Sequence, residues 1–162
     1  MDTNRRPREL TRAPSKTTSF RRARDQRGAI AVEFALIVPI LLLLVLGILE
    51  FGFAYHSWDA TQNAAREGAR LGAVSPDVVE IEARVRGTTS FLDQSNLDVT
   101  IECGITGGSF GTCPAPSGWD EGDIVRVTVE YSYGFLTPLP NFVGLGTEMD
   151  MKSVSEARFE GQ

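Results

Sequence analysis

The stretch RGAIAVEFALIVPILLLLVLGILEFGFAY, residues 27–55, decides how this chain is organised. Every residue from 29 to 49 is apolar, glycine or proline, with the single exception of Glu33. As a helix rising about 1.5 Å per residue, this run is roughly 31 Å long, which matches a bilayer hydrocarbon core of about 30 Å. Because four consecutive leucines at 41–44 leave no polar face, the sequence favours a membrane span over a buried core helix.

The charges on the two sides of the apolar run differ in sign. Residues 1–27 contain nine Lys/Arg and three Asp/Glu, a net charge of +6, whereas residues 56–162 contain seven Lys/Arg and sixteen Asp/Glu, a net charge of −9. Since basic flanks stay on the cytoplasmic side, we expect a single-pass membrane protein with its N-terminus in the cytoplasm and its C-terminal part exported. This topology explains the arginine-rich leader, and we expect no nucleic-acid partner.

These signals predict an α+β protein, in which a long N-terminal transmembrane helix extends beyond the membrane and packs with a small exported antiparallel-sheet head. The first 27 residues contain almost no large apolar side chains, so we expect them to be disordered. Ser75 and Pro76 provide a stop for the helix. The four expected parts are a basic cytoplasmic leader (1–28), a transmembrane helix (29–54), its extracytoplasmic continuation (55–75) and the head (76–162).

Within the head, the sequence predicts one helix and three strands. Residues 77–86 place apolar side chains on one helical face, although their Val-Glu-Ile-Glu alternation also suits a strand. Residues 97–103 and 124–133 alternate as strands do, and the Gly-, Pro- and Ser-rich segment between them predicts a hairpin with a long loop. Residues 149–159 combine helical spacing with an alternating end, and we expect their core to form a third strand at the edge of the sheet.

The two cysteines, Cys103 and Cys113, both fall in the exported part. An even number of cysteines outside the cytoplasm favours a disulfide, and the absence of a CxxC motif argues against a metal site. Two free thiols are the alternative. A bond closing a loop of about eleven residues would contribute on the order of 3 kcal/mol in the chain-entropy model.

Nothing in the sequence supports catalysis. There is one histidine, and we find no nucleophile motif, no phosphate-binding glycine loop and no cluster of metal ligands. Asp120, Glu121 and Asp123 lie close together and could attract Ca²⁺, but a solvated acidic turn is the simpler interpretation. We therefore expect no enzyme activity, no metal and no cofactor.

Glu33 is the one charge inside the apolar run. An acidic residue at mid-membrane costs roughly 2.5 to 3.5 kcal/mol, and less near an end of the span. The carboxylate could simply reach the headgroups. Alternatively, a cut between Gly28 and Ala29 would create an α-amino group, which in one copy could pair with Glu33 of a neighbour displaced along the helix axis. In a low dielectric such a pair would fix the stagger between subunits.

The segment from Arg27 to Val74 resembles the TadE-like pseudopilins of tight-adherence (Tad, or Flp) pilus systems. Proteins of this family have a short basic leader, a glycine, a Glu-Phe pair, an Ala-Leu run with a proline, a second glutamate after the span and an Ala-Arg-rich continuation. The matching residues here are Gly28, Glu33-Phe34, Ala35-Leu36, Pro39, Glu50 and residues 65–70 (AREGAR).

The resemblance implies a minor pseudopilin that is cleaved after Gly28 by a prepilin peptidase and contributes structurally to pilus assembly. Such a protein would lie in the bacterial cytoplasmic (inner) membrane or be incorporated in the pilus. Its partners would be the membrane, that peptidase, other pilins and pseudopilins, and the proteins of the pilus assembly platform. The alternative is an unprocessed single-pass membrane protein whose exported domain binds an envelope partner or a ligand. The state of the bond between Gly28 and Ala29 separates the two hypotheses.

A stripe of small residues, Ala60, Ala64, Gly68 and Gly72, repeats every four positions beyond the span. Small side chains at this spacing allow another element to approach the helix closely. We favour docking of the chain's own head on this packing stripe, and contact with the helices of other pilins is the alternative.

Overall fold

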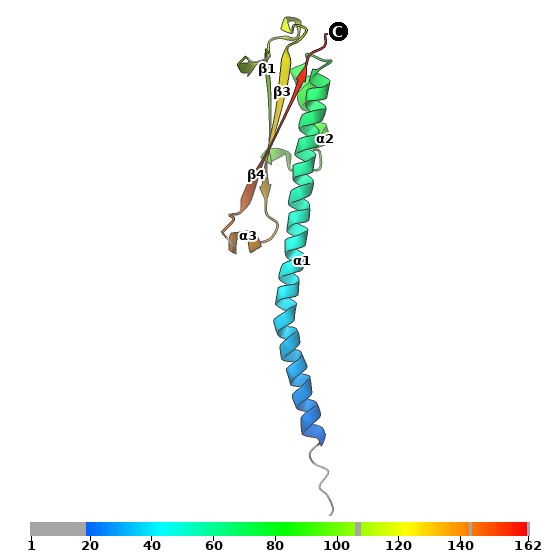
Figure 1. The fold of residues 1–162 in the computed structure, drawn as a ribbon, viewed down its shortest axis with the longest axis vertical. Coiled ribbons are helices and arrows are strands. Elements are labelled where there is room, and N and C mark those ends of the chain that lie inside the picture. Colours follow the sequence, from blue (N-terminus) through cyan, green and yellow to red (C-terminus); the bar gives the residue numbers. More distant parts are fainter. Residues whose placement is uncertain (1–18, 106–107, 143, 162) are drawn as a thin grey trace, which may run out of the picture. The chain divides into compact units, whose positions relative to one another are not determined.

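The computed structural model describes residues 19–105, 108–142 and 144–161. It confirms an α+β fold in which a long apolar N-terminal helix is followed by a small four-stranded antiparallel sheet (Figure 1). The chain divides into two compact units, Met1–Leu43 and Leu44–Gln162. The helix α1, Ser19–Gly72, contributes residues to both units, and all other helices and strands belong to the second unit.

The start of α1 corrects one prediction. We expected disorder over residues 1–27, but the helix begins at Ser19, so this expectation was wrong for residues 19–27; residues 1–18 lie outside the described part of the chain. Arginine and alanine are good helix formers, and extending an existing helix costs far less than nucleating a new one. The long apolar helix therefore continues backward into the basic leader.

The apolar part of α1 is long and apolar enough to cross a membrane. Its side chains are not covered by other parts of the protein. Helix α1 ends at Gly72, close to the predicted stop. A second helix, α2 (Val78–Thr88), follows as predicted. The Asp77 carboxylate caps it by accepting hydrogen bonds from the amides of Val79 (2.9 Å) and Glu80 (3.4 Å), which satisfies two of the free amides at the helix start.

The sheet has the strand order β2-β1-β3-β4, and each neighbouring pair is antiparallel. The three predicted strands are confirmed, including the position of the last one at an edge. The three-residue strand β2 was not predicted, because a short Phe-Gly-Thr segment has no alternation to detect and becomes a strand only by pairing with β1. The strands are β1 (Leu97–Gly104), β2 (Phe110–Thr112), β3 (Ile124–Gly134) and β4 (Glu148–Arg158).

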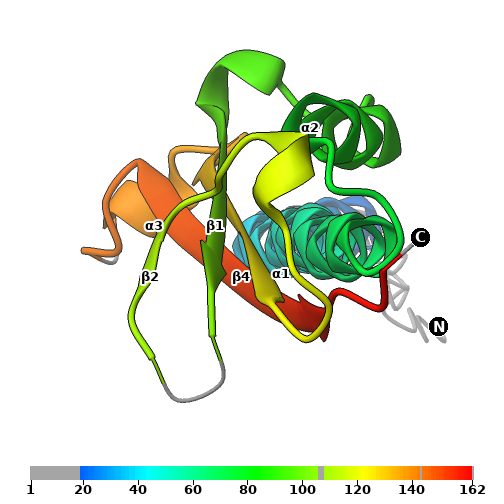
Figure 2. The ribbon, with the colours of Figure 1, turned by 90° about the horizontal axis from the view of Figure 1, so that it is seen from above.

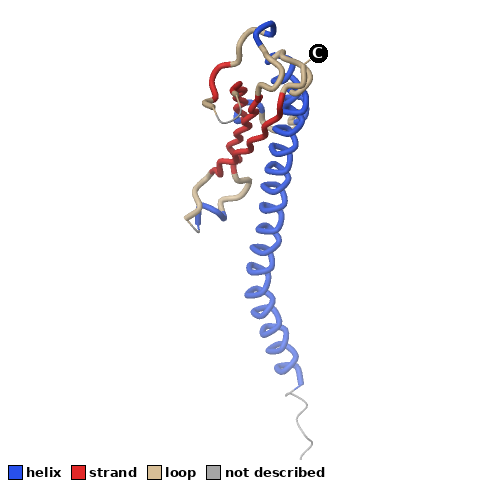
Figure 3. Tube along the Cα trace, turned by 45° about the horizontal axis from the view of Figure 1, so that its top comes forward, coloured by secondary structure: helices blue, strands red, loops and turns tan. Residues whose placement is uncertain are grey.

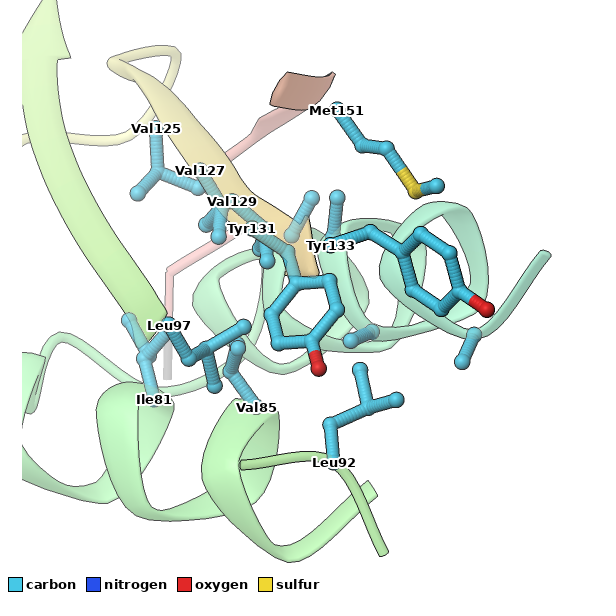
Figure 4. Close-up of a cluster of buried hydrophobic side chains, with 14 of the residues drawn as sticks. Ile81, Val85, Leu92, Leu97, Val125, Val127, Val129, Tyr131, Tyr133 and Met151 are labelled. Carbon is cyan, nitrogen blue, oxygen red and sulfur yellow. The ribbon is translucent and has the colours of Figure 1, made fainter. Parts of the chain in front are cut away.

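The core lies between the sheet and the two helices, which cover the same face (Figure 2). Strand β3 supplies Val125, Val127 and Val129, which are fully buried, and α2 supplies Ile81 and Val85 (Figure 4). The opposite face of the sheet is polar, because alternate residues of a strand point to opposite sides. Cross-strand ion pairs on this face join Arg126 to Glu156 at 2.7 Å and Lys152 to Glu130 at 2.6 Å.

The connection between β3 and β4 leaves the sheet at one end and carries a short helix, α3 (Leu139–Phe142) (Figure 3). At the other end of the sheet the C-terminal segment returns to the end of α1, where the amide of Glu160 donates a hydrogen bond to the carbonyl of Ala73, the residue after the helix, at 2.9 Å. The sheet therefore packs on α1 along one face, and the segment after β4 is also hydrogen-bonded to the end of α1.

Candidate functional site

The packing stripe on α1 lies against the chain's own sheet and α2. A Cβ built on Gly68 would lie 2.6 Å from Cγ2 of Val85, and one built on Gly72 would lie 2.6 Å from Cγ1 of Val125. Real Cβ atoms essentially never approach so closely. Ala60 and Ala64, the other members of the stripe, are also buried within the protein. The small residues therefore let the head approach the helix backbone, as in the intramolecular docking that we favoured.

Glu50 is buried at the point where the apolar run ends. Its carboxylate accepts hydrogen bonds from the amide of Leu136 at 2.8 Å, the amide of Thr137 at 3.0 Å and the hydroxyl of Tyr133 at 3.3 Å. Only 6% of the residue is exposed. A buried carboxylate needs such donors, because an unpaired charge away from water is costly. Glu50 thus holds the start of the β3–β4 connection against α1.

Sequence reasoning recognised Glu50 only as part of a family pattern. Its partners are main-chain amides 86 and 87 residues away, and main-chain donors carry no signal in a sequence. The one usable signal was a lone carboxylate directly after a long apolar run, which had to find a partner or face water.

The Tyr133 hydroxyl is affected by this arrangement. Burial of the side chain and the negative charge of Glu50 raise the pKa of Tyr133 to about 12. The phenol therefore stays protonated and remains a hydrogen-bond donor to Glu50 across the physiological pH range.

The residues of the expected processing motif all lie in the first unit, on α1. Gly28, Ala29, Glu33 and Phe34 are exposed, and a Cβ built on Gly28 would meet no atom within 4 Å. Among the side chains that the structure describes, none makes an ion pair or hydrogen bond with Glu33. The bond between Gly28 and Ala29 and the carboxylate of Glu33 are thus both available to groups outside this chain.

The disulfide between Cys103 and Cys113 is present. It joins β1 to the residue that follows β2, next to the register pair Cys103 and Gly111. The bond therefore stabilises the short outer strand, which has only three residues of ladder.

The acidic segment near residue 120 closes on itself. The Asp123 carboxylate accepts a hydrogen bond from the amide of Asp120 at 3.0 Å, and the carbonyl of Asp120 accepts one from the amide of Asp123, also at 3.0 Å. Gly122 has a φ of 99°, which glycine adopts at little cost. Within the described ranges, no group of three or more His, Cys, Asp or Glu side chains is arranged to hold a metal ion.

Comparison with known proteins finds a family match within the N-terminal half of the chain. Residues 28–70 match the family of the TadE-like protein. The search of curated proteins and the search of solved structures gave no significant match. The matched segment begins at Gly28 and contains Glu33, Glu50 and three of the four residues of the packing stripe. The resemblance predicted from the sequence is thereby confirmed: residues 28–70 are a TadE-like segment, which implies involvement in the assembly of Tad pili.

Proposed function

We propose that the protein is a minor pseudopilin that contributes structurally to the assembly of a Tad/Flp-type adhesion pilus after a prepilin peptidase cuts the chain behind Gly28. The observation that carries this proposal is the family match, which starts at Gly28 and continues through the span into the packing stripe. The segment before Gly28 is then a leader, and Ala29 becomes the mature N-terminus.

The bond between Gly28 and Ala29 suits a peptidase. Both residues are exposed on α1, and a protease that binds its substrate in an extended form must first unwind this part of the helix. Glycine lowers the cost, because it is less favourable in a helix than alanine by roughly 1 kcal/mol. The missing side chain also lets the scissile bond enter a narrow active site.

In this function α1 crosses the cytoplasmic membrane once, with the leader in the cytoplasm and the head outside. The charge difference between the leader and the head supports this orientation. Other pilins and pseudopilins and the assembly platform proteins are the partners, and the exposed apolar surface of α1 is where they and the lipid would meet it.

Glu33 then sets the register between subunits. After cleavage, the α-amino group of Ala29 in one copy pairs with Glu33 of the next copy, which is displaced along the helix axis. The exposure of Glu33, without a partner among the described side chains of its own chain, supports this role. A copy in the wrong register would leave both charges unpaired in a low dielectric.

The N-terminus of the protein extracted from membranes of cells that contain the matching peptidase tests the proposal. The unchanged chain should begin at Ala29, whereas Gly28→Leu should retain the leader. Gly47→Leu is a matched control, because a Cβ at either glycine meets no atom within 4 Å, and it should be cut normally. An uncut wild-type chain in these cells would favour an unprocessed single-pass protein whose exported domain binds an envelope partner or a ligand.

A further inference from the structure

We propose that the connection between β3 and β4, described over residues 135–142 and 144–147, forms a membrane-contact loop that lies on the lipid surface beside the end of the span. The proposal rests on the proposed function only in requiring that α1 crosses a membrane. The occupant of this surface is the outer leaflet of that membrane, and no protein partner is needed.

The loop exposes large apolar side chains that are not packed in the core of the head. Leu136 is 67% exposed, Phe142 is 84% exposed and Leu145 is 62% exposed. The sequence of residues 135–147, FLTPLPNFVGLGT, contains no charged residue. This segment is apolar and uncharged although it belongs to an acidic domain. Such a surface is suited to a lipid boundary, where exposed apolar groups leave water.

Glu50 fixes the position of this loop along α1. Its carboxylate binds the amides of Leu136 and Thr137 at 2.8 Å and 3.0 Å, and it is the first residue after the apolar run that ends at position 49. Within the same unit, the side chains of Leu44, Ile48 and other residues of 44–49 are apolar and mostly exposed. The loop is therefore held at the height where the lipid-facing surface of the helix ends.

The neighbouring surface of the second unit continues the same character. Phe51, Tyr55 and Trp58 of α1 lie about one turn apart along the helix. They line a groove together with Met149 and Met151 of β4, and Asp150 and Lys152 of the same strand also line it. Aromatic side chains of this kind gather at membrane–water interfaces, because their rings are apolar and, in Tyr and Trp, one end is polar. The three aromatic side chains lie within eight residues of Glu50 on α1, so they mark the same boundary as the loop.

The loop's contact with lipid can be measured in the full-length protein reconstituted in phosphatidylcholine vesicles. A fluorescent label is attached to Phe142→Cys, with the native disulfide kept oxidised, and is quenched either by doxyl-labelled lipid or by aqueous iodide. Val79→Cys is the matched control: Val79 is equally apolar and 76% exposed, but it lies on α2, which contacts α1 near Gly68, roughly 27 Å along the helix from Glu50. Leu44→Cys reports on the span itself.

We expect doxyl lipid to quench the labels at positions 44 and 142 at least threefold more than the label at position 79, and iodide to show the reverse order. Lipid quenching at 44 with iodide access at 142 equal to that at 79 would overturn the loop contact and leave the span intact. Protection of position 142 from both quenchers would also overturn it, because another protein surface would then cover the loop. Absence of lipid quenching at 44 would refute the membrane span and the loop contact together, whereas N-terminal processing is measured separately.

Discussion

The carboxylate of Glu50 and the main-chain amide of Leu136 lie 2.8 Å apart, although 86 residues separate them in the chain. This hydrogen bond and its neighbour at Thr137 connect α1, at the end of its apolar run, to the segment that directly follows β3. Glu50 therefore determines where the distant β3–β4 connection is held, and the first prediction concerns replacement of Glu50.

Replacing Glu50 with alanine should lower the free energy of unfolding of the head by about 2 to 4 kcal/mol, because two amides and a buried hydroxyl lose a charged acceptor. Glu50→Gln keeps one acceptor oxygen, so its effect should be smaller. Asp59→Ala is the control, since Asp59 is exposed and accepts a hydrogen bond from Asn63 at 3.2 Å on the helix surface. Denaturant unfolding in detergent micelles measures the free energy of unfolding of all three variants. Equal losses of stability for Glu50→Ala and Asp59→Ala would refute the stabilising role of the Glu50 hydrogen bonds.

The stability of the head should fall as the pH rises from about 10 to about 12. The pKa of Tyr133 is raised by burial and by the charge of Glu50 to about 12, against an ordinary value of 10.0. Between these values the unfolded chain loses the phenolic proton while the folded chain keeps it, so the folded state loses stability. Below about pH 10 the contribution is fully present.

Rapid pH jumps, which avoid alkaline damage to the disulfide, allow this titration to be followed by tyrosinate absorbance. The difference between the wild-type protein and Tyr133→Phe isolates the one phenol. If Tyr133 ionised in the folded protein near pH 10, burial beside Glu50 would not be controlling its proton.

Gly68→Ala and Gly72→Ala should each destabilise the head by about 1 to 3 kcal/mol, because the new methyl group would meet Val85 or Val125 at 2.6 Å. Gly87→Ala on α2 is the matched control. A Cβ there meets no atom within 4 Å, so this variant should gain up to about 1 kcal/mol from helix propensity. Thermal unfolding compares the three, and a gain at all three positions would show that the head does not pack closely on the stripe.

Glu33→Val should leave membrane insertion unchanged and reduce piliation strongly, since the span becomes more apolar while the partner of the α-amino group is lost. Glu33→Gln, which keeps the shape and removes the charge, should behave in the same way. Membrane fractionation and counts of pili on cells measure the two properties. Normal piliation in both variants would exclude the pairing of Glu33 with a neighbouring N-terminus.

The features that could be predicted are those with a local pattern. The uninterrupted apolar run indicated α1, and strict alternation from Val125 to Val129 indicated a strand with one buried face. The even number of cysteines after the predicted span, without a CxxC motif, indicated their disulfide. In each case the residues that carry the signal are neighbours in sequence, so their periodicity or spacing is visible without a structure.

The rest depends on contacts between distant parts of the chain. Strand β2 exists because β1 offers it a ladder, and the partners of Glu50 are amides that every residue possesses. The start of α1 at Ser19 follows from helix extension into a segment whose composition alone favoured disorder. The loop at 135–147 has a composition that reads as an ordinary turn region until its position beside Glu50 is known.

The two attachments of the sheet to α1, at Glu50 and at the carbonyl of Ala73, also have a mechanical consequence. They lie 23 residues apart, which is about 34 Å along a helix, and the packing stripe fills the interval between them. The head therefore stiffens α1 between these two points. A sideways force on α1 would have to break the contacts of the sheet before the helix could bend there. Any bending of α1 during assembly should therefore occur outside residues 50–73.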